Sequence, residues 1–203
     1  MLTQRGFTII ELVVAVAIVG ILAMVGLPAY SVWMQNLRIR GATEAVQSSL
    51  QLARSSAVGR NLPTNLSFTT GNPVGNVDHV VYTVLSPASP PASFVNPACT
   101  AQPIPNPPPA NAVDCIRRMT NEGPNVTVTM TPPDAYMITF GSMGQVVNNA
   151  DGSSTPTQID FRSAVSTDTA IRPLRILIRA GGRIMTCDPD PGILATDSRF
   201  CAP

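Results

Sequence analysis

Residues Phe7 to Ala29 read FTIIELVVAVAIVGILAMVGLPA, and within this run only Thr8 and Glu11 are polar. A helix of this length, at about 1.5 Å per residue, matches the roughly 30 Å hydrocarbon core of a bilayer. The preceding residues, MLTQRG, are few and carry one positive charge, at Arg5. The run therefore predicts a helix that can lie in lipid.

A cleaved signal peptide is the first alternative, because small residues between Ala23 and Ala29 could serve as its cleavage site. Two features argue against it. Glu11 lies one turn into the apolar run, where a carboxylate costs several kcal/mol unless it is paired. The helical pattern also continues beyond Ala29, which favours one long helix over a removable segment.

The continuation of the helix is amphipathic. Its apolar residues recur at helical spacing, and these are Ala42, Val46, Leu50, Ala53 and Ala57. We predict one helix from Phe7 to Val58, with a hydrophobic half over 7–29 and an amphipathic half over 30–59. Gly59 is its expected C-cap, and Pro28, close to Gly26, predicts a kink because proline removes a backbone hydrogen bond.

The start of this helix resembles the processing signal of prepilins. Arg5-Gly6-Phe7-Thr8-Ile9-Ile10-Glu11 is similar to their short basic leader ending in Gly and followed by Phe-Thr-x-x-Glu. The run ARSSAV, Ala53 to Val58, resembles the GspH/FimT branch, which contains minor pseudopilins of type II secretion systems and minor pilins of type IV pili. The resemblance implies that prepilin peptidase removes residues 1–6 by cleavage between Gly6 and Phe7, and that the Phe7 amine is methylated.

Glu11 has a physical role in this scheme. Cleavage creates an ammonium group at Phe7, one helical turn from the Glu11 carboxylate. In a filament the carboxylate could instead face a neighbour's amine, where low dielectric strengthens the attraction and sets the axial register. The alternative is a plain membrane anchor that tolerates the acid. Close helix packing is favoured by small residues, namely Ala15, Ala17, Gly20, Ala23 and Gly26.

After the helix, residues 60–203 change to short β-like runs. The predicted strands are Thr64–Phe68, His79–Leu85, Val126–Met130, Tyr136–Phe140, Gln145–Val147, Ile159–Arg162, Leu174–Arg179 and Arg183–Thr186. Tight turns are expected at Gly141–Gly144 and Ala180–Gly182. These elements predict an α+β fold, in which antiparallel β-sheet packs on the amphipathic half of the helix, and the resemblance implies the same.

The segment 86–112 is rich in Pro, Ala and Asn, a composition that predicts an exposed loop rather than a packed element. Partner binding through polyproline recognition is the alternative reading of this loop. Residues 148–157 form a second predicted polar loop. An exported chain with four cysteines favours disulfides, and we expect Cys99–Cys115 and Cys187–Cys201 among three possible connectivities.

No catalytic constellation is present in the sequence, and we predict a protein that is not an enzyme and has no cofactor or metal. The single histidine, His79, is expected on a surface or at a sheet edge. Asp188, Asp190 and Asp197 could contribute to a calcium site, but their spacing matches no complete calcium loop and Asp-Pro steps are ordinary turns.

Arginines near the C-terminus raise a second possibility. Some FimT-like minor pilins bind DNA through a Gly-Arg-x-Arg motif, and this chain has Gly182-Arg183 but Met185 at the second basic position. Arg175, Arg179 and Arg183 could share a strand face and track phosphates. The alternative is a solvated face whose charges prevent edge aggregation.

The sequence thus predicts a structural minor pilin or pseudopilin. It would span the bacterial inner membrane once, place its domain in the periplasm, and then join the tip of a type IV pilus or a type II secretion pseudopilus. Its expected partners are other minor and major pilins or pseudopilins, prepilin peptidase and membrane lipid. The alternative function is a DNA-binding minor pilin for DNA uptake in natural transformation.

Overall fold

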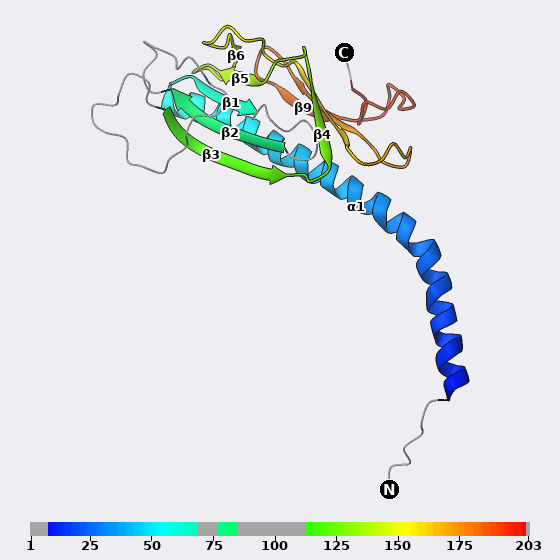
Figure 1. Cartoon of the computed structure of the whole chain (residues 1–203). Coiled ribbons are helices and arrows are strands. Elements are labelled where there is room, and N and C mark those ends of the chain that lie inside the picture. The colour runs from blue at the N-terminus through cyan, green and yellow to red at the C-terminus, as the bar shows by residue number, and fades with distance from the viewer. Residues whose placement is uncertain (1–7, 69–76, 85–112, 202–203) are drawn as a thin grey trace.

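The computed structural model describes residues 8–68, 77–84 and 113–201. A single long helix, α1 (Ile9–Arg60), projects from a β-rich head (Figure 1). The strands of the head are β1 (Thr64–Phe68), β2 (Val77–Val84), β3 (Val113–Glu122), β4 (Val126–Thr131), β5 (Met137–Phe140), β6 (Val146–Val147), β7 (Gln158–Ser163), β8 (Leu174–Ile178) and β9 (Ile184–Cys187). The predicted loop over 86–112 lies outside the described residues.

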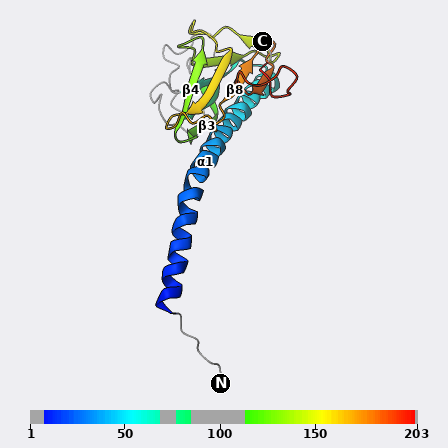
Figure 2. The same cartoon turned by 90° about the vertical axis from the view of Figure 1, so that its right-hand side faces the viewer.

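Two antiparallel sheets form the head. One has the order β3-β2-β1-β5-β6 and the other the order β4-β7-β8-β9. The second half of α1 packs against strands of both sheets, while its first half extends away from them (Figures 1 and 2). The predicted α+β fold is therefore confirmed, although the division into two sheets was not foreseen.

The core confirms the amphipathic pattern of the helix. The five apolar residues singled out by their spacing, from Ala42 to Ala57, are all fully buried. They pack in one cluster with strand residues from both sheets, including Leu66, Ile138 and Phe161. The helix therefore supplies the surface on which the two sheets meet.

Both ends of α1 are capped. Thr8 is the N-cap, and its hydroxyl accepts a hydrogen bond from the Glu11 backbone N–H at 3.4 Å. The prediction of Gly59 as C-cap is wrong, because the helix continues to Arg60. Asn61 ends it instead in the left-handed conformation, with φ 54°, and its N–H donates to the carbonyls of Ala57 and Val58. Asparagine tolerates this conformation better than most residues.

The helix axis bends in its first half. Within the described residues no unbroken helix is both long and apolar enough to cross a membrane, whereas Ile9–Met24 and Ala29–Arg60 together meet that requirement across a 43° bend. The residues between these two segments include Gly26 and Pro28. The assignment of the kink to Pro28 stays a prediction.

Eight of the nine strands lie where the sequence predicted them, to within a residue or two at their ends. The strand that was missed is β3, which reads VDCIRRMTNE and lacks apolar alternation. It pairs with β2 over most of its length, with irregular register between Val77 and His79 and between Val81 and Tyr82. Its position at the edge of the sheet explains why a polar sequence can form it.

The structure corrects the prediction for His79. Because β3 pairs with the outer side of β2, His79 belongs to an inner strand and is completely buried rather than at an edge. Its Nε2 atom lies 2.8 Å from the hydroxyl of Ser49 on α1. The histidine therefore joins the sheet to the helix.

This burial predicts acid sensitivity. Desolvation lowers the pKa of His79 from 6.5 to about 4, so between these values the unfolded chain binds more protons than the folded chain. We expect the contribution of His79 to be complete above pH 6.5, and the free energy of unfolding to fall by about 3 kcal/mol as the pH drops to 4. Chemical denaturation at several pH values measures this slope. In His79→Gln the same interval should lose this histidine-dependent part, and an unchanged slope in the variant would contradict the prediction.

The two predicted glycine turns are confirmed, and they lie together. The β5–β6 turn is closed by Gly141 N–H donating to the Gln145 carbonyl at 2.9 Å, and the β8–β9 turn by Arg179 N–H donating to the Arg183 carbonyl at 3.0 Å. A bond from Val146 N–H to the Ala180 carbonyl, 2.9 Å long, connects the two sheets here. The turns thus fasten both sheets at one end of the head.

The helix takes part in the same junction. Arg54 donates from Nε to the Gly144 carbonyl at 3.0 Å. Gly144 and Gly182 have φ values of +77°, a conformation that side chains other than glycine's rarely adopt. A Cβ added to Gly182 would lie 1.9 Å from the Gly144 carbonyl oxygen. Contact between helix and turns therefore depends on a glycine at position 182.

Candidate functional site

The most exposed apolar surface of the described chain is the first half of α1. Its large side chains have exposed fractions between 51% and 84%. They are Ile9, Ile10, Leu12, Val13, Val14, Val16, Ile18, Val19, Ile21, Leu22, Met24 and Leu27. Soluble monomers rarely expose a contiguous apolar surface of this extent, so this segment is suited to lipid or to other subunits.

Glu11 lies within this apolar surface and is itself exposed. As the acidic residue of the first turn, it interacts favourably with the positive end of the helix dipole, and its N–H bonds to the Thr8 hydroxyl. Its carboxylate accepts no hydrogen bond from the described part of the chain. Gly6 and Phe7, the predicted cleavage site, lie outside the described residues, so pairing of Glu11 with an amine stays a prediction.

Cysteine pairing agrees with the sequence where the structure describes it. Cys187 and Cys201 form a disulfide, with Cα atoms 5.0 Å apart, and this confirms one predicted pair. Cys115 is also disulfide-bonded, while its predicted partner Cys99 lies outside the described residues. The Cys187–Cys201 bond fastens the C-terminal segment to β9, close to α1.

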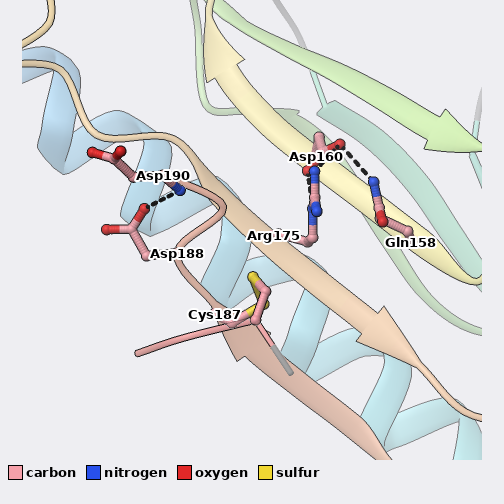
Figure 3. A network of polar contacts seen from close by, with 7 residues as sticks. Gln158, Asp160, Arg175, Cys187, Asp188 and Asp190 are labelled. Atoms are coloured by element: carbon pink, nitrogen blue, oxygen red, sulfur yellow. Dashed lines mark hydrogen bonds and ion pairs between the residues drawn. A yellow bond between two sulfur atoms is a disulfide. The ribbon is translucent and has the colours of Figure 1, made fainter. Parts of the chain in front are cut away.

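The three arginines predicted to share a strand face, Arg175, Arg179 and Arg183, differ in their surroundings. Arg175 binds Asp160 with two bonds, from Nε at 2.6 Å and from one terminal nitrogen at 3.1 Å, and Gln158 also donates to Asp160 (Figure 3). This ion pair is partly buried, so Arg175 serves to join β7 and β8. Arg179 and Arg183 are instead exposed beside the β8–β9 turn. The sequence did not reveal Asp160 as a partner.

The aspartates considered for calcium have local roles. Asp188 accepts the Asp190 N–H at 3.1 Å (Figure 3), and Asp190 accepts the Gly192 N–H at 2.9 Å. Asp197 forms an ion pair with Arg199 at 2.7 Å, and this arginine lowers the pKa of the Asp197 carboxyl to about 2. Over residues 8–68, 77–84 and 113–201, no three metal-ligating side chains gather in one place.

Ser49 and His79 are residue types that can act as nucleophile and base in a catalytic site. Both side chains are fully buried between α1 and β2, where no substrate reaches them. Their position favours a structural role. The candidate functional surface of the described residues is therefore the exposed first half of α1.

Comparison with known proteins places this architecture in a class. Residues 1–27 match the prokaryotic N-terminal methylation motif, and residues 42–182 match the family of the type II transport protein GspH. A methylation motif on an exposed apolar helix, followed by an α+β head, defines a pilin-like structural subunit. The chain belongs to the GspH family.

Individual relatives are similar over shorter regions. A fimbrial protein of Pseudomonas aeruginosa is 41% identical over 58 residues, which are 29% of this chain and 37% of that protein. A type IV major alpha-pilin of Moraxella bovis is 42% identical over 53 residues, 25% of this chain and 33% of that one. The chain therefore matches about a third of the length of these relatives. A crystal structure of the type IV minor pilin FimU of Pseudomonas aeruginosa covers 72% of this chain and 90% of its own, with 18% identity and a TM-score of 0.45.

Proposed function

We propose that this protein is a minor pilin or pseudopilin that enters the inner membrane through α1 and is later drawn into a pilus tip or a secretion pseudopilus. The observation that carries the proposal is the exposed apolar surface from Ile9 to Leu27, which contrasts with the packed second half of the same helix. Lipid covers this surface before assembly, and the helices of neighbouring subunits cover it afterwards. The head then contacts other minor subunits.

Processing completes the proposal. Prepilin peptidase cleaves between Gly6 and Phe7, and the new Phe7 amine is methylated; the matched methylation motif supports this step. Residues 7–29 then form the membrane and filament-core segment, residues 30–59 carry the head, and 60–203 form the exported domain. Glu11 sets the register of one subunit against the next, and a kink at Pro28 adapts the helix to its neighbours.

Intact mass and N-terminal sequencing of the chain from native membranes test this proposal. A chain that begins at a methylated Phe7 supports pilin-type processing. A chain that begins after Ala23 to Ala29 is an ordinary secreted protein and contradicts the proposal, because the apolar surface is then absent from the mature molecule. Co-purification with pilus subunits or with secretion components distinguishes the two assembly machines.

DNA binding is a second candidate function, favoured by the exposure of Arg179 and Arg183 at one turn. Arg175 contributes little to it, because its guanidinium is already bound to Asp160. We expect the double variant Arg179→Gln/Arg183→Gln to weaken DNA binding at low salt. The slope of log binding constant against log salt concentration should fall in magnitude by about 2, because two phosphate contacts are lost. Gel shift with duplex DNA measures both quantities. Arg118→Gln, an exposed arginine on β3, is the control, and a wild-type chain without any shift at low salt removes this candidate.

A further inference from the structure

A groove of about 410 Å³ lies where α1 leaves the head. Its walls include Trp33, Leu37 and Arg40 from the helix, together with Arg172 and Arg199 from the head. The apolar part is open to solvent, since Trp33 is 56% exposed and Leu37 is 42% exposed. The groove therefore combines an exposed aromatic surface with several guanidinium groups.

The position of Arg172 in this groove is fixed by Asn36. The Asn36 side chain accepts the Arg172 backbone N–H at 2.8 Å and donates to the Ala170 carbonyl at 3.2 Å. These two bonds hold a loop of the head against the helix, one turn before Arg40. Arg40 and Arg172, which are far apart in the sequence, thus line the same groove.

The groove carries unused positive charge. Its three arginines, Arg40, Arg172 and Arg199, exceed the two nearby aspartates, Asp188 and Asp197, by one charge. Asp197 pairs with Arg199, and its charge also acts on Arg172. Arg40 and Arg172 are exposed and form no ion pair within the described residues. An anion can therefore bind these two guanidinium groups without first breaking an ion pair, and guanidinium matches the geometry of phosphate oxygens.

The end of the groove at Trp33 lies close to the height expected of a membrane surface. At about 1.5 Å per residue, Trp33 lies about 9 Å beyond Leu27 along the axis, and Arg40 about 20 Å. Headgroups extend about 5–8 Å beyond each side of the hydrocarbon core. If the apolar segment lies along the bilayer normal, the 43° bend reduces the height of Arg40 above Leu27 to about 14 Å. The long Arg40 side chain, which points back toward the N-terminus, can span most of the remaining distance to the headgroups. Tyr30 and Trp33, with rings 5.8 Å apart, form the aromatic pair typical of an interface.

We propose that this groove binds the headgroup of an anionic phospholipid in the periplasmic leaflet, with the phosphate at Arg40 and Arg172 and with Trp33 against the lipid. The inference rests on the proposed membrane-anchored function and adds a specific lipid site to it. Bound lipid holds the head close to the membrane before assembly, and withdrawal of the helix from the bilayer releases it.

The single tryptophan of the chain provides the readout, because Trp33 lines the groove. The full chain is reconstituted in nanodiscs of phosphatidylcholine in which phosphatidylglycerol with the same acyl chains replaces an increasing fraction. We expect the Trp33 emission to shift to shorter wavelength as phosphatidylglycerol increases. In Arg40→Gln/Arg172→Gln the phosphatidylglycerol fraction at half-response should rise about tenfold, because each arginine near an anionic surface contributes to binding.

The control variant Arg179→Gln/Arg183→Gln loses the same net charge at the other end of the head and should respond like wild type. Inorganic phosphate added to pure phosphatidylcholine discs should leave the emission unchanged, which separates a lipid headgroup from a free anion. A wild-type response that does not depend on phosphatidylglycerol overturns the inference. An equal loss of the phosphatidylglycerol response in both double variants also overturns the inference. So does a Trp33 emission shift that depends on protein concentration or on added DNA rather than on phosphatidylglycerol.

Alkaline extraction of the same chain from lipid vesicles tests the membrane anchor separately from the lipid site. If the chain is not retained in the bilayer, the proposed membrane-anchored function fails. If it is retained and Trp33 shows no response to phosphatidylglycerol, only the lipid site fails.

Discussion

Replacement of Glu11 by alanine is expected to lower incorporation into filaments or tip complexes by about tenfold or more, while membrane insertion stays intact. The carboxylate lies on the exposed apolar part of α1, where it would meet a neighbour's amine in a medium of low dielectric. Its removal deletes this attraction and leaves the neighbour's ammonium unpaired. Insertion should not suffer, because an alanine enters lipid more easily than a carboxylate does.

Co-purification of the variant with its partner subunits measures incorporation, and membrane flotation measures insertion. Glu11→Gln is the matched variant, because glutamine keeps the size of the side chain and suits the third helical position while it removes the charge. If charge sets the register, both variants fail alike. Normal co-purification of either variant contradicts the proposed role.

Replacement of Gly182 by alanine is expected to lower the free energy of unfolding by about 3 kcal/mol or more, which corresponds to a fall in Tm of roughly 10 °C. The added Cβ would lie 1.9 Å from the Gly144 carbonyl oxygen, and its residue would have to keep a φ of +77°. The obstacle is backbone rather than a flexible side chain. Relief therefore requires the two turns to separate, and the bond from Arg54 to the Gly144 carbonyl is then disturbed as well.

The neighbouring residue provides the control for this experiment. A Cβ on Gly181 meets no atom within 4 Å, and its backbone is not left-handed, so Gly181→Ala should melt close to wild type. Thermal denaturation of both full-length variants in the same detergent measures the difference. Equal melting temperatures would show that the junction of the two turns is more adaptable than its geometry indicates.

The sequence predicted those parts of the fold that depend on local pattern. The helix follows from apolar periodicity, and the turns follow from glycines that adopt positive φ. The strand β3 was missed, because its residues become ordered through pairing with β2 rather than through their own pattern. His79 was misplaced for the same reason, since the strand added outside β2 turned an expected edge into an interior position.

The candidate site residues likewise divide into those that a local sequence motif identifies and those that only the fold brings together. The motif around Glu11 is contiguous in the sequence, and the family comparison recognises it. The partner of Arg175 could not be identified, because Asp160 lies on the preceding strand of a sheet whose order the sequence does not specify. The groove beside Trp33 was also not foreseen, since Asn36 and Arg172 meet only after the head has folded onto the helix.

The way α1 is fastened to the head has a mechanical consequence. A subunit in a filament is under tension along its helix. Here the contacts between helix and head are spread along the helix axis, from Asn36, where α1 leaves the head, to Arg60, which pairs with Asp114. Force along the axis loads these contacts together in shear instead of peeling them apart one by one. Detachment therefore requires many contacts to break at once, so the head should remain folded under pulling forces that would unzip a joint loaded at one end.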